Sequence, residues 1–202
     1  MKLNEEKKDV KKQEETSFVK EVFEMVEMLV IAACIVLSMY SFVFRLCRVS
    51  GPSMDQSLAD GQMLIVSNIN YTPERGDIVI FHQTSGNAYG YNEPIVKRVI
   101  AKAGETIDID FRTWTVTITD KDGNTQVLDE SEYRYLDVGH ATLGSDYDFP
   151  IEVPEGYLFV MGDNRNHSAD SRSSLIGLVD ERRVVGKAIL RLTPLDKFGK
   201  LD

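Results

Sequence analysis

The feature that most limits how this chain can fold is a run of twenty residues from Met25 to Phe44, which reads MVEMLVIAACIVLSMYSFVF. Its only charged side chain is Glu27, close to the start of the run. A helix of this length, rising ~1.5 Å per residue, crosses a hydrocarbon layer about 30 Å thick. A cleaved secretory signal would begin nearer the N-terminus with a shorter apolar core, and a buried core helix would usually show a polar stripe. The run therefore predicts a single transmembrane helix over residues 25–44.

The residues on either side of this span predict its orientation. Residues 1–24 are a charged tail in which six lysines are interleaved with acids, and nothing in it could form a core. Only Arg45 and Arg48 closely follow the span. Because flanking segments rich in Lys and Arg stay in the cytoplasm, we expect a cytoplasmic tail, a single-pass anchor in the cell membrane and an extracytoplasmic domain over residues 45–202.

Composition and motif spacing argue against several classes of partner. With 202 residues, 43% of them hydrophobic, the chain can bury one sizeable core. The net charge of −9 argues against a general nucleic-acid binder. Asp120, Asp122 and Asn124 have calcium-loop spacing, but Thr125 and Ser131 stand where such a loop needs Gly and Glu. The three histidines are scattered along the chain, so no zinc site is expected either.

After residue 48 the pattern changes to one typical of β-strands. Short runs of β-branched and apolar residues are separated by Gly, Pro, Asp and Asn. The segment 113–119 alternates apolar residues with threonine, Trp114 is interpreted as a packing residue, and residues 121–124 are typical of a hairpin turn. We therefore predict a mainly β domain with strands within 61–68, 76–83, 94–101, 105–110, 112–120, 155–163 and 182–192.

One predicted strand, PIVKRVIA, carries a lysine, Lys97, among apolar residues. At a strand end, a lysine can extend its charged end into water. If it is buried instead, loss of solvation disfavours the ammonium form and lowers its pKa. A pKa lowered by ~2 from about 10.4, at a cost of roughly 3 kcal/mol, would leave the amine half neutral near pH 8. Lys97 is thus a candidate general base.

A candidate nucleophile lies shortly after the predicted span. Ser53 follows Gly51 and Pro52 in the sequence VSGPSM, and Gly and Pro can present a hydroxyl rigidly at the start of a strand. A serine needs a base within hydrogen-bond reach to attack a carbonyl at neutral pH. Lys97 is one candidate for that base, and His167 oriented by Asp163 is the other.

A third segment, MGDNRNHSADSRSSLIGLV at residues 161–179, is rich in polar and charged groups directly after a predicted strand. Asp163, Arg165, Asp170 and Arg172 could form a locked ion-pair network there. A solvated turn is an equally plausible interpretation of the segment alone, because surface loops are often polar.

Taken together, three motifs behind an N-terminal anchor closely resemble the type I signal peptidase family. They are RGDIVIF at 75–81, KRVIA at 97–101 followed by Gly104-Glu105, and GDNRNHSADSR at 162–172. The resemblance extends over residues 25–192. It implies a β-rich catalytic domain of the signal-peptidase type, in which residues 102–152 are a variable insertion that forms a cap or small subdomain.

The resemblance also implies a role for each matching residue. Ser53 would be the nucleophile of a Ser-Lys dyad, Lys97 its general base, and Ser168 the hydroxyl that orients the lysine amine. The remaining matches would be an ion-pair cluster of Asp163, Asp170 and Arg172 and a substrate-binding group of Gly51, Pro52 and Met54. Such a dyad needs no metal or cofactor. The implied substrates are exported pre-proteins at the membrane lipid surface, bound as extended strands and cut after small residues of the Ala-X-Ala type.

Two positions depart from the pattern of the family. Some relatives carry a second oxyanion hydroxyl two residues before the nucleophile, but that position here is Gly51, so a backbone group or water would have to replace it. Gln56 and Ser57 stand where the family usually has proline and threonine. We expect the missing proline to loosen the turn and to shift substrate preference.

Two other functions are compatible with parts of this sequence. A membrane-anchored module without catalysis could bind exported chains, although the complete set of Ser53, Lys97 and Ser168 argues against it. An autoprotease like the phage-type repressors shares the Ser-Lys dyad, but the predicted span and the lack of a DNA-reading helical domain before it argue against that function.

Overall fold

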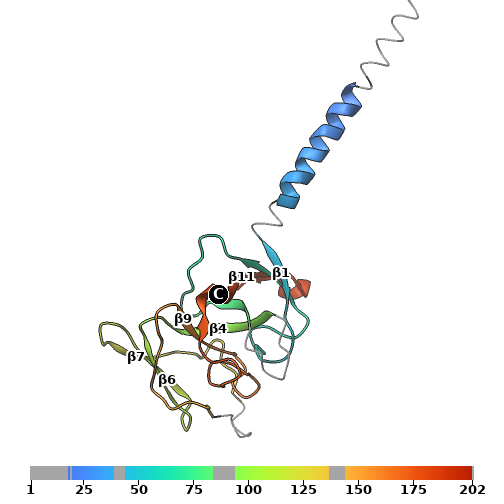
Figure 1. Ribbon diagram of the computed structural model, residues 1–202. Helices are drawn as coiled ribbons and strands as arrows, with labels where there is room; N and C mark the ends of the chain where they lie inside the picture. Colours follow the sequence, from blue (N-terminus) through green and yellow to red (C-terminus); the bar gives the residue numbers. More distant parts are fainter. Residues whose placement is uncertain (1–17, 19, 39–43, 84–93, 137–143, 202) are drawn as a thin grey trace, which may run out of the picture. The chain divides into compact units, whose positions relative to one another are not determined.

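The computed structural model of the protein describes residues 18, 20–38, 44–83, 94–136 and 144–201. The chain divides into two compact units, Met1–Phe44 and Arg45–Asp202. In the first unit, residues 20–38 form a helix (Figure 1). Residues 39–43 of the predicted transmembrane span lie outside the described residues. Over the described residues, no helix combines the length and the hydropathy needed to cross a bilayer.

The second unit is built from two antiparallel β-sheets (Figure 1). The larger sheet has the strand order β1-β2-β11-β3-β4-β9-β10, with β12 paired to β11. Its strands are β1 (Arg45–Arg48), β2 (Met63–Ser67), β3 (Ile78–His82), β4 (Pro94–Lys102), β9 (Tyr157–Met161), β10 (Val179–Asp180), β11 (Val184–Arg191) and β12 (Gly199–Lys200). Two short 3-10 helices, η1 (Glu181–Arg183) and η2 (Leu195–Lys197), flank β11.

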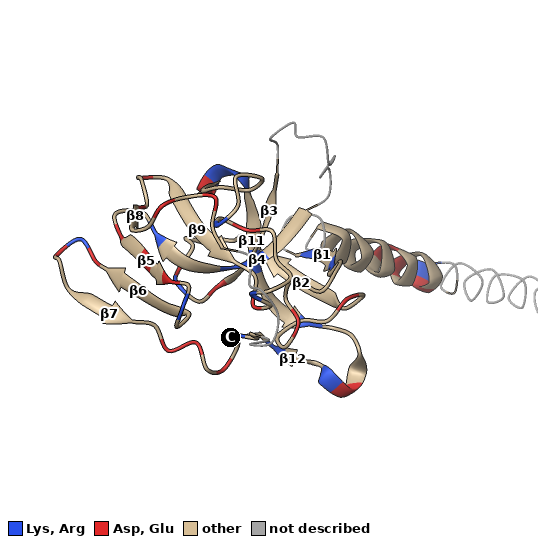
Figure 2. Cartoon of the chain, turned by 90° about the horizontal axis from the view of Figure 1, so that it is seen from below, with Lys and Arg blue, Asp and Glu red and all other residues tan. Residues whose placement is uncertain are grey.

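The smaller sheet lies within the predicted insertion. Its order is β7-β6-β5-β8, with β5 (Thr106–Asp110), β6 (Thr115–Thr119), β7 (Thr125–Val127) and β8 (Ile151–Glu152). Figure 2 shows β5 and β8 of this sheet next to β9. The alternation of β5 and β6 turns Ile107 and Ile118 inward, where they share one apolar cluster with Phe159 and Met161 of β9. The smaller sheet is therefore packed onto the larger one through a common core.

The prediction of a mainly β domain is confirmed, because each of the seven predicted runs contains a strand. The hairpin between β6 and β7 is also present, and Trp114 is buried with 4% of its surface exposed. In the turn between the two strands, the Asp120 carboxylate accepts hydrogen bonds from the backbone N–H groups of Asp122 and Asn124. The calcium-like spacing of these residues therefore matches an ordinary turn.

Candidate active site

The site is built around the loop between β1 and β2, which carries Ser53. Gly51 has a φ of 82°, a left-handed conformation that favours glycine, and its N–H donates to Asp60 Oδ1 at 2.8 Å. Farther along, the N–H of Leu58 donates to the Met54 carbonyl at 2.8 Å. These bonds hold the loop in a fixed shape. The first of these bonds also occupies the Gly51 N–H, which is therefore not a free donor.

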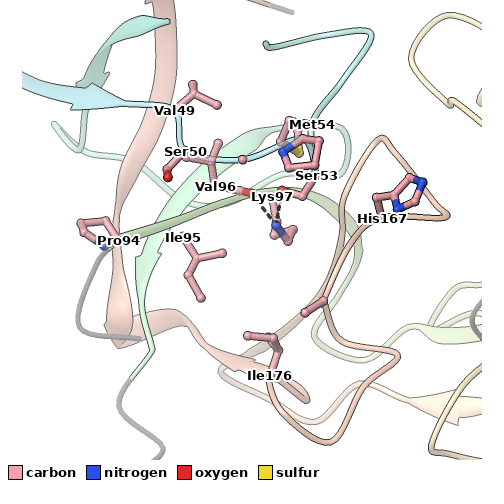
Figure 3. A pocket seen from close by; sticks show the side chains of 13 residues that line it. Val49, Ser50, Ser53, Met54, Pro94, Ile95, Val96, Lys97, His167 and Ile176 are labelled. Atoms are coloured by element: carbon pink, nitrogen blue, oxygen red, sulfur yellow. Dashed lines mark hydrogen bonds between the residues drawn. The ribbon is translucent and has the colours of Figure 1, made fainter. Parts of the chain in front are cut away.

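Lys97, on β4, meets Ser53 directly. Only 3% of its surface is exposed, and its Nζ lies 2.7 Å from Ser53 Oγ (Figure 3). A second hydrogen bond joins Nζ to the Val96 carbonyl at 3.0 Å. The amine therefore has a fixed position beside the hydroxyl.

Burial lowers the pKa of Lys97 from its ordinary value of 10.5 to about 8. The charges of Asp170 and Asp163 act in the opposite direction and raise the pKa, and the charge of Arg172 lowers it. Desolvation is the largest of these effects. A substantial fraction of the amine is thus neutral near pH 8 and able to accept a proton.

His167, the alternative base, is placed differently. Its side chain is exposed and lines the same pocket as Ser53 and Lys97, but it projects from a separate loop (Figure 3). Within the described residues, no hydrogen bond joins the His167 imidazole to Ser53. The carboxylate of Asp163, which would have to orient it, is fully buried and is bound on both oxygens by Arg98 at 2.9 Å. The geometry therefore favours Lys97 over His167 as the base.

A groove of about 300 Å³ passes over the Ser53 hydroxyl and the Lys97 amine. One wall is the segment 49–54, with Gly51 and Pro52 at its surface, and the other is the first part of β4, from Pro94 to Lys97. Met54 borders the groove, but 1% of its surface is exposed and its side chain packs in the core beneath. It can therefore shape the floor of the groove while offering little surface to a ligand.

Each wall of the groove is next to, or part of, a strand with one unpaired edge. The first half of β4 pairs with β3 on one side, whereas its pairing with β9 begins only at Arg98. The second edge of residues 94–97 consequently has no strand partner in the described part of the chain. Similarly, β2 is the only described strand that pairs with β1. An extended peptide could form backbone hydrogen bonds with such edges.

The ion pair of Asp170 and Arg172 lies close enough to Lys97 for both charges to affect its pKa. Arg172 Nε and Nη2 donate to the two Asp170 oxygens, each at 2.8 Å, and both side chains are buried. Burial acts to raise the pKa of Asp170, but the hydrogen bonds and charge of Arg172 outweigh it, so the pKa is lowered. Asp170 Oδ2 also accepts from the Gly162 N–H at 3.0 Å. The pair therefore fixes the chain that follows β9.

The sequence suggested that Asp163 and Arg165 could join this pair in one ion-pair network. In the structure, their side chains bind other partners. Asp163 is bound by Arg98 of β4, and Arg165 is bound by Glu130 of the insertion through two hydrogen bonds of 2.9 and 2.7 Å. Arg98 and Glu130 were missed because their partners are distant in sequence. One signal could have identified Arg98. It directly follows Lys97 on β4, so its side chain must lie on the opposite face of the strand.

Ser168, which the resemblance assigned to orienting the lysine, is not bonded to it in this structure. Its Oγ is buried without a hydrogen bond of ordinary geometry, although it lies near enough to Asp170 to contribute to the lowered pKa of that carboxyl. Gly162 explains the close packing here, because a methyl group at that position would collide with Ser168 Oγ and the Ser53 carbonyl oxygen. Ser168 therefore reaches the site region because residue 162 has no side chain.

Gln56 has a φ of 89°, which a non-glycine residue seldom adopts. Proline cannot adopt it at all, because its ring fixes φ near −65°. The turn is nevertheless closed by hydrogen bonds from the N–H groups of Asp55 to Pro52 O and of Ser57 to Met54 O, both at 3.1 Å. The turn at Gln56 is therefore closed, in a backbone conformation that proline could not adopt. The effect of the missing proline on substrate preference stays a prediction.

Comparison with known proteins finds relatives that match most of the chain. A family model described as "Signal peptidase, peptidase S26" matches residues 22–193. Signal peptidase I of Bacillus licheniformis is 37% identical over 185 residues, which cover 90% of this chain and 94% of the relative. Signal peptidase I T of Bacillus subtilis (strain 168) is 38% identical over 175 residues, 84% of each chain. A crystal structure of a signal peptidase I from Enterococcus faecalis V583 is 28% identical and covers 58% of this chain and 97% of its own, with a TM-score of 0.42.

The family match extends over most of the chain, and two relatives exceed one third identity over most of both lengths. The resemblance to type I signal peptidases is therefore confirmed, and with it the prediction that the protein is a peptidase. The chain belongs to the signal peptidase family, peptidase S26.

Proposed function

We propose that the protein is a serine endopeptidase that removes N-terminal signal peptides from exported pre-proteins, with Ser53 as nucleophile and Lys97 as general base. The observation that carries this proposal is the 2.7 Å separation between Lys97 Nζ and Ser53 Oγ, combined with the burial that lowers the lysine pKa to about 8. A neutral amine at hydrogen-bond distance from a hydroxyl is the arrangement that activates a serine.

The reaction follows from that pair in two halves. Neutral Lys97 takes the Ser53 proton as Oγ attacks the scissile carbonyl carbon, and the carbonyl oxygen becomes an oxyanion. When this intermediate collapses, the ammonium of Lys97 returns the proton to the leaving amine, and the signal peptide stays bound to Ser53 as an ester. Lys97, neutral again, then takes a proton from water, and the resulting hydroxyl attacks the ester carbonyl. Collapse of the second intermediate restores the Ser53 hydroxyl with the proton held by Lys97.

The groove fits an extended peptide with small side chains near the cut. The unpaired edges of residues 94–97 and of β1 can each bond to the backbone of such a peptide. The space of about 300 Å³ around Ser53 is bordered by Ile95, Val96 and Met54, so bulky side chains next to the scissile bond would have little room. These features support a preference for alanine at positions one and three before the cut.

The groove continues beside β1. A second hollow of about 710 Å³ shares Val49, Ser50 and Pro94 with the first and extends along β1 from Arg45. It provides space for signal-peptide residues farther from the cut. Gly51 and Pro52 line the first hollow together with Ser53, in keeping with a role in substrate binding.

The proposal includes a membrane anchor at residues 25–44, with the tail in the cytoplasm and residues 45–202 on the outer side. The support for it is the apolar run itself and the excess of lysine before it. Tethering the enzyme to the same membrane lipid that holds its substrates would raise the effective concentration of both.

The test is cleavage of a purified pre-protein by the full chain in detergent. We expect the wild type to release the mature protein and Ser53→Ala and Lys97→Ala to release none, while His167→Ala keeps most of the activity. A pre-protein with a bulky residue just before the cut serves as the control and should resist cleavage. Binding without cleavage by the wild type would indicate a non-catalytic binding module, and activity of Lys97→Ala together with loss in His167→Ala would assign the base to histidine.

A further inference from the structure

Asn164 makes two contacts with the loop that carries the nucleophile. Its side-chain Nδ2 donates to the Pro52 carbonyl at 3.1 Å, and its backbone N–H donates to the Ser53 carbonyl at 3.1 Å. Because a carbonyl oxygen can only accept, the amide nitrogen and not the amide oxygen must face Pro52. Only 3% of the Asn164 surface is exposed. The side chain is therefore a buried clamp on the peptide that precedes Ser53.

Asn164 is itself held on a rigid segment. The neighbouring Asp163 carbonyl accepts from the Tyr135 N–H at 2.8 Å, and the Arg165 N–H donates to the Tyr135 carbonyl at 3.0 Å. The side chains of Asp163 and Arg165 are both buried and bound in ion pairs. A residue between two such anchors has little freedom to move, so the position of its amide is well defined.

The clamp sets the direction of the Ser53 N–H. The Pro52 carbonyl and the Ser53 N–H belong to one planar peptide group, which is trans, so the two groups point in opposite directions. With the carbonyl held towards Asn164, the N–H is turned away from it. Within the described residues, the Ser53 N–H donates no hydrogen bond. It is a free donor on the reacting residue, and its direction depends on the peptide plane that Asn164 holds.

We propose that Asn164 is a positioning residue that orients the Ser53 N–H as the oxyanion donor. This inference rests on the proposed function, because it concerns the oxyanion formed when Ser53 attacks a carbonyl. A donor that is already oriented before the reaction stabilises the developing charge without further reorganisation. Asn164 acts through the Pro52–Ser53 peptide and not by contact with the substrate.

The structure offers a way to remove this effect alone. The bond from the Asn164 N–H to the Ser53 carbonyl comes from the backbone, so it is retained when the side chain is changed. Asn164→Ala removes the bond to Pro52, and Asn164→Leu removes it while keeping a similar branched shape. Asn124→Ala, in the exposed turn before β7, is the matched control.

We expect both Asn164 variants to lower kcat by ~10- to 100-fold, less than the loss of a whole oxyanion donor, because the Ser53 N–H itself remains. KM and the midpoint of the pH–rate curve should stay close to the wild-type values, since neither groove nor Lys97 is altered. A peptide aldehyde, which forms a tetrahedral adduct with Ser53, should lose affinity in parallel with kcat. The corresponding peptide alcohol, which forms no adduct, should bind as before. Thermal melting of each variant verifies that it is folded.

Several results would overturn the inference while leaving the proposed function intact. They are a wild-type kcat in both variants, a raised KM with unchanged kcat, a shifted pH midpoint, or equal losses of affinity for aldehyde and alcohol. If Ser53→Ala cleaved as well as the wild type, the proposed function would fail instead, so the two failures are distinguishable.

Discussion

The buried amine of Lys97 should make the protein less stable at neutral pH than it would be with an uncharged residue in its place. Lys97→Met tests this, because methionine is unbranched and of similar length but carries no proton to lose. At pH values where the lysine is charged, the wild type holds an ammonium group in a site with 3% exposure. We therefore expect the variant to be inactive but more stable.

The magnitude follows from the lysine pKa. In the folded state it is about 8, against 10.5 for an ordinary lysine. Between these values the unfolded chain binds more protons than the folded one, so the stability of the wild type falls as the pH falls from 10.5 to 8. At ~1.4 kcal/mol for each tenfold difference in proton affinity, the total is about 3 kcal/mol. The penalty is fully present below pH 8 and absent above 10.5.

The assay is urea unfolding of the full chain in detergent, wild type against Lys97→Met, from about pH 7 to about pH 11. The difference in free energy of unfolding should grow by about 3 kcal/mol towards lower pH and then level off. Groups that titrate equally in both proteins cancel in this difference. Lys197→Met, at an exposed position, controls for the loss of one positive charge. A difference that is the same at every pH would refute the argument that burial keeps this amine partly neutral.

Two further predictions concern the backbone around the site. Gln56→Gly should raise the free energy of unfolding by about 1 kcal/mol, because glycine adopts the observed φ of 89° without strain. Gln56→Pro should lower the free energy of unfolding by more than that amount. Chemical denaturation of the two variants measures both effects, and a stabilising proline would contradict the observed turn. Gly162→Ala should reduce kcat by ~100-fold or more, because the added methyl group collides with the Ser53 carbonyl and Ser168. Gly199→Ala, where a methyl group would contact nothing within 4 Å, is its control in the cleavage assay, and equal effects of the two substitutions would rule out the steric explanation.

Much of the fold could be predicted because local patterns determine it. The period-two alternation of β5 and β6 places Ile107 and Ile118 on one face, and that face is the one buried against β9. The short strands were not predictable in the same way. In β1, arginine stands at both ends of the sequence RLCR, and the strand exists because β2 pairs with it along its whole length. Pairing partners of that kind are not encoded in the strand itself.

The residues of the candidate site also divide into those that the sequence could predict and those that it could not. Lys97 could be identified from the contradiction between its charge and its apolar neighbours, and Ser53 from the tight loop before it. Asn164 gave no such signal, because an asparagine in a polar loop is ordinary. Its role depends on the direction of a single amide towards Pro52, which only the folded chain determines.

The ion pairs near the dyad have an electrostatic consequence beyond holding the loops together. Asp163 and Asp170 both act to raise the pKa of Lys97, and two unpaired carboxylates so close would favour the ammonium form that cannot serve as a base. Each carboxylate is instead bound on both oxygens by an arginine, Arg98 or Arg172, and the charge of Arg172 itself lowers the lysine pKa. These two ion pairs can therefore fix the backbone around Ser53 without raising the pKa of Lys97 back to its ordinary value.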